Sequence, residues 1–229
     1  MSDYSITHVY PTDRRALAQI DALLKQEGIC RDGNLDYICA MQDENDNIIA
    51  TGSCFGPTLR CFAVSREHQG EGLLNEVISH LMQVQYDHGN THLFLYTKVN
   101  SAKFFSSLGF YEIARVDRTL VFMENRKSGF PNYLKNLGKT KKEGVSAALV
   151  MNANPFTLGH QYLVETAAAQ CDTLHLFVLS EDASLVPFSV RRRLVQEGVG
   201  HIPNVVLHDS GPYIISNATF PSYFLKDEA

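Results

Sequence analysis

The fold of the second half of this chain is set by one stretch, Asn152-Ala153-Asn154-Pro155-Phe156-Thr157-Leu158-Gly159-His160. The apolar run 147–151 precedes it, and residues 161–169 after it have the composition of a helix. A strand, a loop with proline and glycine, and a helix that begins at Gly159 would place the loop amides and His160 at a helix N-terminus. Because a helix N-terminus stabilises an anionic phosphate group, the pattern indicates nucleotide handling.

The residues that follow continue the same alternation. Strand patterns occur at 174–179 and 205–208, and a helix pattern at 189–199 lies between them. Strands that alternate with helices are typical of a parallel sheet with helical crossovers. We therefore predict a Rossmann-like α/β domain over residues 145–229.

The loop 155–160 also resembles that of a known family. Its Pro-Phe-Thr-Leu-Gly-His sequence is similar to the (Thr/His)-x-Gly-His loop of the nucleotidyltransferase superfamily, which includes phosphopantetheine adenylyltransferases. The tetrad alone is a weak signal, and its position between a strand and a helix strengthens it. The resemblance implies that Thr157 and His160 donate hydrogen bonds to phosphate oxygens of a nucleotide.

The composition is that of a globular protein without a general affinity for nucleic acid. With 229 residues and 45% hydrophobic content, the chain can form one or two packed domains. The 25 acidic residues exceed the 20 basic residues and give a net charge of −5, so no overall basic field favours nucleic acid. Phosphate groups must therefore be bound by local groups.

Cysteine usage and hydropathy indicate the compartment. The five cysteines form no Cys-x-x-Cys pair and have no histidines at metal-ligand spacing, so we expect reduced thiols and no metal site. The N-terminus lacks the pattern of a signal peptide, and no uncharged apolar stretch approaches about 20 residues. These features favour a cytoplasmic enzyme with no membrane partner.

Residues 1–125 predict a separate mixed α/β domain. Their patterns follow the order β-α-β-β-β-α-β-α-β and end with a strand at 120–124. Basic residues and helix breakers then accumulate up to Gly144. This composition predicts a linker or docking segment at 126–144.

A glycine-bearing loop in the first domain indicates a pyrophosphate site. Gln69, Gly70 and Gly72 stand where a strand gives way to a helix, and the glycines let backbone amides approach a pyrophosphate. Together with the segment 100–110, which ends in Leu-Gly-Phe, the loop resembles the GNAT acyltransferase fold. The resemblance implies a CoA-like ligand that is bound by this loop and by Asn100.

Two positions depart from the GNAT pattern. Leu74 replaces the last small residue of the loop, and Phe105 stands where a tyrosine often serves as general acid for the departing thiolate. Phenylalanine cannot donate a proton. We therefore expect the first domain to bind a CoA-like group and to transfer acetyl groups poorly, with a purely structural role as the alternative.

An arginine-rich helix start at 187–195 supplies candidate phosphate ligands. It contains Arg191, Arg192 and Arg193, and an arginine can bind phosphate oxygens through two parallel hydrogen bonds. A solvated basic helix face is the alternative interpretation.

Residues 211–226 complete a resemblance that spans essentially the whole chain. A GNAT-like domain, the segment 151–157 and the Tyr-Ile-Ile-Ser-x-Ala-Thr-Phe-Pro sequence at 213–221 together resemble the citrate lyase ligase family. The resemblance implies a ligase that makes acetyl-adenylate from acetate and ATP and then acetylates the thiol of the CoA-like prosthetic group on the citrate lyase acyl carrier subunit. The second domain would hold ATP with Mg²⁺, and the first domain the prosthetic arm.

The same resemblance assigns roles to residues. His160, Thr157 and Arg191 would act in catalysis, and Arg191 is favoured over Arg193 by its spacing to Leu194 in the family pattern. No covalent nucleophile is required, because catalysis consists largely of aligning two anions and stabilising charge. The further residues expected to bind the nucleotide are Asn152, Asn154, Pro155, Phe156, Gly159, Ser216 and Thr219.

Two other functions stay open on sequence grounds. One is adenylyl transfer to a phosphopantetheine or nicotinamide nucleotide, and the other is non-catalytic binding of nucleotide or CoA by a remnant or regulator. The family continues into further strands that complete the ATP site. The resemblance therefore implies a C-terminally truncated chain, and we expect deficient ligation from these 229 residues alone.

Overall fold

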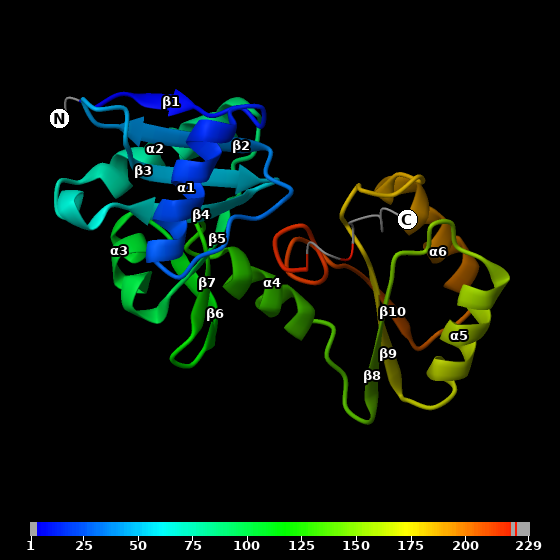
Figure 1. Ribbon diagram of the computed structural model, residues 1–229. Coiled ribbons are helices and arrows are strands. Elements are labelled where there is room, and N and C mark those ends of the chain that lie inside the picture. Colours follow the sequence, from blue (N-terminus) through cyan, green and yellow to red (C-terminus); the bar gives the residue numbers. More distant parts are fainter. Residues whose placement is uncertain (1–3, 221–222, 224–229) are drawn as a thin grey trace. The chain divides into compact units, whose positions relative to one another are not determined.

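A computed structural model describes residues 4–220 and residue 223 of the chain. The chain divides into two compact units, Met1–Gly129 (unit 1) and Phe130–Ala229 (unit 2), and each has its own sheet and hydrophobic core (Figure 1). None of the helices formed by the described residues has the length and apolar character that a membrane crossing requires.

Unit 1 contains a seven-stranded mixed sheet in the order β1-β2-β3-β4-β5-β7-β6. Strands β4 and β5 run parallel, and the other described pairs are antiparallel. The elements are β1 (Ile6–His8), α1 (Arg14–Gln26), β2 (Tyr37–Gln42), β3 (Ile48–Phe55), β4 (Thr58–Val64), η1 (Arg66–His68), α2 (Leu73–Asp87), β5 (Phe94–Thr97), η2 (Val99–Ser101), α3 (Ala102–Ser107), β6 (Tyr111–Val116) and β7 (Leu120–Glu124).

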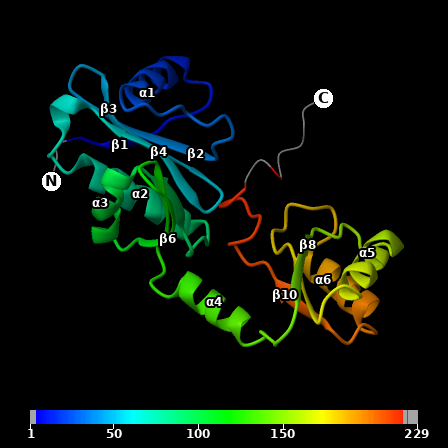
Figure 2. The ribbon, with the colours of Figure 1, turned by 90° about the horizontal axis from the view of Figure 1, so that it is seen from below.

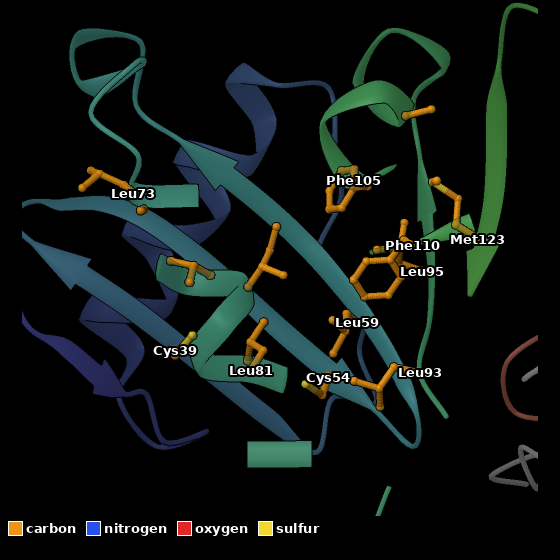
Figure 3. Close-up of a cluster of buried hydrophobic side chains, with 14 of the residues drawn as sticks. Cys39, Cys54, Leu59, Leu73, Leu81, Leu93, Leu95, Phe105, Phe110 and Met123 are labelled. Atoms are coloured by element: carbon orange, nitrogen blue, oxygen red, sulfur yellow. The ribbon is translucent and has the colours of Figure 1, made fainter. Parts of the chain in front are cut away.

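Helices cover both faces of the unit 1 sheet, with α1 on one face and α2 and α3 on the other (Figure 2). The larger core lies under α2 and α3, where Leu81, Phe105 and Phe110 meet strand residues such as Leu59 and Leu95 (Figure 3). Because these side chains are almost fully buried, this core fixes α2 and α3 against the sheet.

Strand β6 was not predicted from the sequence; it follows α3 in the chain and lies beside β7 at the edge of the sheet. The expected order ended with a single strand at 120–124, and that part of the prediction was wrong. Five of the six residues of β6 are exposed and one is partly buried. An edge strand that is solvated on both faces shows no apolar alternation, so the pattern could not reveal it.

Unit 2 contains a parallel three-stranded sheet in the order β10-β9-β8. Its elements are α4 (Gly129–Gly138), β8 (Ser146–Met151), α5 (Leu158–Ala168), β9 (Thr173–Val178), α6 (Phe188–Val199) and β10 (Val205–Asp209). The predicted alternation of strands and helices with a parallel sheet is confirmed.

Both crossover helices of unit 2 pack on the same face of its sheet, as the two views show (Figures 1 and 2). Val164 of α5 and Val195 of α6 meet Leu174 and Leu176 of β9 in one buried cluster. Gly198 of α6 lets the helix approach the loop after β8 closely, because a Cβ there would stand 2.3 Å from the Phe156 ring.

The segment 126–144 contains a helix. The division between the units falls at Gly129/Phe130, and residues 129–138 form α4. The rings of Phe130 and Tyr133 lie 5.2 Å and 4.9 Å from the ring of Tyr213, all within unit 2. The helical part of this segment thus packs on the loop that follows β10.

The histidine pair of the unit 2 sheet predicts a pH dependence of stability. Nδ1 of His175 on β9 lies 2.9 Å from Nε2 of His208 on β10, and burial, followed by the charge of His175, lowers the pKa of His208. The unfolded chain therefore takes up the proton more readily. Above about pH 6.5 His208 should leave the free energy of unfolding unchanged, because it is neutral in both states. Below that pH the free energy of unfolding should fall, because the unfolded chain binds the proton first.

Urea unfolding measured from about pH 8 to about pH 5 tests this expectation, with His208→Gln as the comparison. The variant should lose part of the acid-side slope. An identical slope in both proteins would contradict the assignment to His208.

Candidate functional site

The carboxyl ends of β8, β9 and β10 lie at one edge of the unit 2 sheet, because the three strands are parallel. Three loops leave this edge, at 152–157, 180–187 and 210–220. We call the first the phosphate loop and the second the β9–α6 loop. Ligands of open parallel sheets bind at this edge, so these loops form the candidate nucleotide site.

The phosphate loop places Thr157 at the N-terminus of α5 and His160 in its first turn. The backbone N–H of Thr157 donates to Nδ1 of His160 at 3.1 Å, and the Thr157 hydroxyl lies 2.8 Å from the same nitrogen. A backbone N–H can only donate, so Nδ1 is an acceptor and the proton of the neutral ring lies on Nε2. The helix cap thereby sets which ring nitrogen can donate to a ligand.

The first turn of α5 also offers backbone donors. Leu158 and Gly159 are exposed, and the first N–H groups of an α-helix have no intrahelical acceptor. An anion at this position would meet those N–H groups and the positive end of the helix dipole. Thr157, Gly159 and His160 are therefore brought together as the sequence predicts.

The two predicted asparagines hold the phosphate loop to the β9–α6 loop. The Asn152 side chain exchanges hydrogen bonds of 2.9 Å and 3.2 Å with the Ser184 hydroxyl, and Asn154 Oδ1 accepts from Val186 N–H at 2.9 Å. Pro155, which follows Asn154, is exposed, while Phe156 is partly buried and stacks on the His160 ring at 5.7 Å. In this arrangement Asn152, Asn154 and Phe156 shape the loop itself.

Arg191 does not have the geometry of the predicted phosphate clamp. Its side chain is fully buried in α6, and four of the five guanidinium N–H donors bond to backbone carbonyls of the two loops. A bidentate grip on a phosphate needs two donors on the same side, and this arrangement leaves one. Sequence spacing could not show that the carbonyls would converge on this helix position.

The neighbouring arginines of α6 are more exposed. Arg192 Nε lies 2.6 Å from Asp209 Oδ1, and Arg193 Nε lies 3.9 Å from Glu197 Oε1 in a helical i,i+4 pair. The side chain of Arg193 is 69% exposed. Two positions after Arg191, Arg193 lies about 200° around the helix from it, so it points away from the two loops that Arg191 bonds.

The predicted ligands Ser216 and Thr219 are engaged in the loop after β10. The buried Ser216 hydroxyl donates to the carbonyl of Pro212 at 2.7 Å, and Thr219 Oγ1 accepts from Ser216 N–H at 3.0 Å. Both side chains thus stabilise a turn. Pro221 and Lys226 of the family stretch lie outside the described residues.

Sequence reasoning missed Glu181, which ties this turn to the β9–α6 loop. Its carboxylate accepts from the backbone N–H of Asn217 at 2.8 Å and from the Asn217 side chain at 2.9 Å. An acidic residue shortly after a parallel strand was the available signal, because the carboxyl ends of such strands meet at one edge.

A cavity of about 790 Å³ opens in unit 1 where β4 and β5 separate. The two strands pair only at Thr58/Phe94 and Leu59/Leu95, and Cys61 beyond them has a φ of +53°. The cavity is lined by Glu27, Gly28, Ile29, Cys61, Phe62, Ala63, Val64, His68, Gln69, Gly70, Gly72, Leu73, Leu74, Asn75, Tyr96, Thr97, Lys98, Ser101, Phe104, Phe105 and Leu120.

The predicted glycine loop forms one wall of this cavity. Gly70 and Gly72 have φ values of +93° and +84°, and a Cβ at either position would meet open space. Gln69 lines the cavity as well, whereas Asn100 is exposed and its neighbour Ser101 forms the wall instead. The loop can therefore present backbone amides to a ligand without side-chain obstruction.

The remaining wall of the cavity is largely apolar. Burial raises the pKa of the Cys61 thiol and of the Tyr96 hydroxyl. The Lys98 ammonium donates to the backbone carbonyl of Glu27 and lies 4.0 Å from the Glu27 carboxylate. No sequence pattern indicates that β4 and β5 separate, so Glu27, Cys61, Tyr96 and Lys98 were not predicted to line a cavity.

The two units confirm the predicted α/β fold class, with a mixed sheet in unit 1 and, in unit 2, the parallel sheet with helical crossovers that a Rossmann-like domain has. Residues 146–229 match the family model described as the citrate lyase ligase C-terminal domain.

The chain is homologous to citrate lyase ligases along nearly all of its own length, which confirms the resemblance seen in the sequence. It is 37% identical over 218 residues to the citrate (pro-3S)-lyase ligase of Haemophilus influenzae, covering 95% of this chain and 65% of the relative. The corresponding values for the ligase of Escherichia coli K12 are 38% over 225 residues, 97% and 63%. The chain thus spans somewhat less than two thirds of the length of these curated relatives.

Solved structures are also similar to part of the chain. Escherichia coli ElaA is 19% identical with a TM-score of 0.45, covering 55% of this chain and 100% of that chain. A GNAT-family acetyltransferase of Staphylococcus aureus is 14% identical with a TM-score of 0.44, covering 53% and 97%.

Gly72→Ala should lower the free energy of unfolding of unit 1 by about 1 kcal/mol, because alanine is strained at a φ of +84° even where its Cβ has room. Gly33→Ala is the matched control: a Cβ there also meets open space, and its φ lies outside the left-handed region. Urea unfolding of both variants measures the difference. Equal effects would show that the backbone of the glycine loop is not held in this conformation.

Proposed function

We propose that this chain belongs to an ATP-dependent acetate ligase that acylates the CoA-like prosthetic group of the citrate lyase acyl carrier subunit. The observation that carries the proposal is the cap of α5, where Thr157 fixes the His160 ring beside exposed helix N–H groups. Homology to citrate lyase ligases supports the reaction class.

The proposed reaction has two steps that need no protein nucleophile. A carboxylate oxygen of acetate forms a bond to the α-phosphorus of ATP, and the bond to pyrophosphate breaks. The thiolate of the prosthetic arm then attacks the acetyl carbon, and AMP leaves. Both steps depend on aligning anions and on stabilising charge on the phosphoryl oxygens.

In the first step His160 would donate its Nε2 proton in a hydrogen bond to a phosphate oxygen. Nδ1 is engaged by the Thr157 N–H, so the donor nitrogen and the plane of the ring are set before the nucleotide binds. The Thr157 hydroxyl and the first N–H groups of α5 lie next to the same ring. Donors that are in place in advance need no reorganisation in the transition state.

The remaining charge of the phosphates must be met by other groups. Arg193, the exposed arginine of α6, lies about 200° around the helix from Arg191 and is therefore not proposed as a phosphate ligand. Mg²⁺ bound with the nucleotide would neutralise phosphate charge. Arg191 contributes through the loops that it holds.

The cavity of unit 1 is the proposed site of the prosthetic arm. The amides around Gly70 and Gly72 suit a pyrophosphate, and the apolar wall that includes Phe62, Phe104 and Phe105 suits a pantetheine chain. Phe105 supplies no proton for a departing thiolate. Unit 1 would therefore bind the arm and leave acyl transfer to unit 2.

His160→Ala should reduce acetate-dependent exchange of pyrophosphate into ATP by about 10²–10³-fold, the usual loss for one preorganised donor. Radiolabelled pyrophosphate measures the exchange, and the Escherichia coli ligase serves as positive control. His160→Asn separates the two roles of the ring, because its side-chain oxygen can still accept from the Thr157 N–H. Compared with His160→Ala, His160→Asn should regain stability but should not regain pyrophosphate exchange.

If the wild-type chain catalyses pyrophosphate exchange and His160→Ala does so at the same rate, His160 has no role in the mechanism. Exchange that depends on a phosphopantetheine substrate in place of acetate would identify an adenylyltransferase. Nucleotide binding without any exchange would favour a non-catalytic role.

Titration of dephospho-CoA into the whole chain should give saturable binding that Gly72→Ala weakens, because the amides would no longer be free to approach the pyrophosphate. Isothermal calorimetry measures the binding, with Gly33→Ala as control. The same protein supplied with acetyl-CoA and an amine should acetylate poorly. Robust amine acetylation would refute the binding-only role of unit 1.

A further inference from the structure

The hydrogen bonds of Arg191 join two loops that are separate in sequence. Its Nη1 donates to the carbonyls of Asn152 and Leu179 at 2.9 Å and 2.8 Å, and these residues directly follow β8 and β9. Its Nε and Nη2 donate to the carbonyls of Val186 and Glu181, each at 2.8 Å. One side chain of α6 thus bonds the phosphate loop, the end of β9 and both ends of the β9–α6 loop.

Two side-chain contacts run parallel to these bonds. The Asn152 side chain pairs with Ser184, and Asn154 accepts from the N–H of Val186. Each of them links the phosphate loop to the β9–α6 loop at a point next to a carbonyl that Arg191 holds. The two loops therefore form one hydrogen-bonded body around the guanidinium.

From this arrangement we propose that Arg191 is a positioning residue that fixes the phosphate loop, and with it Thr157 and His160, against the β9–α6 loop. Its consequence for turnover rests on the proposed function. The structural part of the inference, that Arg191 couples the two loops, holds independently of the reaction.

The planar guanidinium is suited to this task and an ammonium is not. Four carbonyls from four directions are met by a rigid fork of five N–H donors, whereas a lysine has three donors on one nitrogen at the end of a flexible stem. Arg191→Lys retains the charge and loses at least one of the four hydrogen bonds. This substitution therefore separates the charge of Arg191 from its geometry.

Amide hydrogen exchange of the whole chain tests the coupling directly. In Arg191→Lys the amides of the phosphate loop and of the β9–α6 loop should exchange at least about tenfold faster together, while those of the unit 1 sheet stay unchanged. Arg192→Lys is the matched control, because the neighbouring arginine bonds Asp209 and Gln196 and neither of the two loops. Ser184→Ala removes one parallel link and should give a smaller effect in the same loops.

Faster exchange in one loop only, or unchanged exchange in both Arg191→Lys and Ser184→Ala, would overturn the coupling. If Arg191→Lys does not fold, hydrogen exchange of the wild-type chain decides the question: protected amides of the two loops should exchange with one common opening free energy, and separate values for the two loops would overturn the coupling.

Pyrophosphate exchange kinetics distinguish positioning from direct phosphate contact. Arg191→Lys should lower kcat by about 10–100-fold and change KM for ATP by less than about threefold, because a displaced loop misaligns His160. A KM that rises about tenfold at unchanged kcat would identify Arg191 as a phosphate ligand and overturn the inference. A wild-type chain without exchange would count against the proposed function, and hydrogen exchange would still test the coupling.

Discussion

The candidate nucleotide site depends on the burial of one guanidinium among backbone carbonyls. Arg191 is fully buried. Its four hydrogen bonds satisfy two carbonyl groups directly after β8 and β9 and two within the β9–α6 loop. A buried polar group without a partner costs about 1–3 kcal/mol, so removal of the guanidinium would affect several groups at once. The loops keep their conformation because the Arg191 side chain donates hydrogen bonds to carbonyl groups of both loops.

Unit 1 also has backbone groups that lack a strand partner, at the point where β4 and β5 separate. Where β4 and β5 part after Leu59/Leu95, neither strand can bond the other, and a cavity opens between them. The glycine loop at Gly70 and Gly72 then faces this space with backbone groups that no side chain covers. In both units the candidate site lies where regular strand pairing ends, which is where backbone donors are available for a ligand.

The sequence predicted the parts of this molecule that depend on local pattern. Apolar runs followed by Pro/Gly loops and helices predicted the parallel sheet of unit 2 and the position of His160 at a helix start. The role of Arg191 could not be predicted in this way, because it is set by carbonyls from residues 152–186 that meet only in the folded chain. Strand β6 escaped detection for the opposite reason, since its exposed residues carry no core pattern.

An anion at the unit 2 site would be attracted by a local feature, because the chain as a whole carries a net charge of −5. The nearby carboxylates are already engaged: Asp182 accepts from the N–H of Phe188 at 2.6 Å, and Glu181 accepts from Asn217. The four hydrogen bonds of Arg191 go to neutral carbonyls, so its charge is spread over the loops rather than cancelled by a bonded carboxylate. The charge of Arg191 offsets part of the charge of the Asp182 and Glu181 carboxylates, so the local attraction for an anion comes from the N-terminus of α5. Such a local field can attract a polyphosphate where the overall charge would repel it.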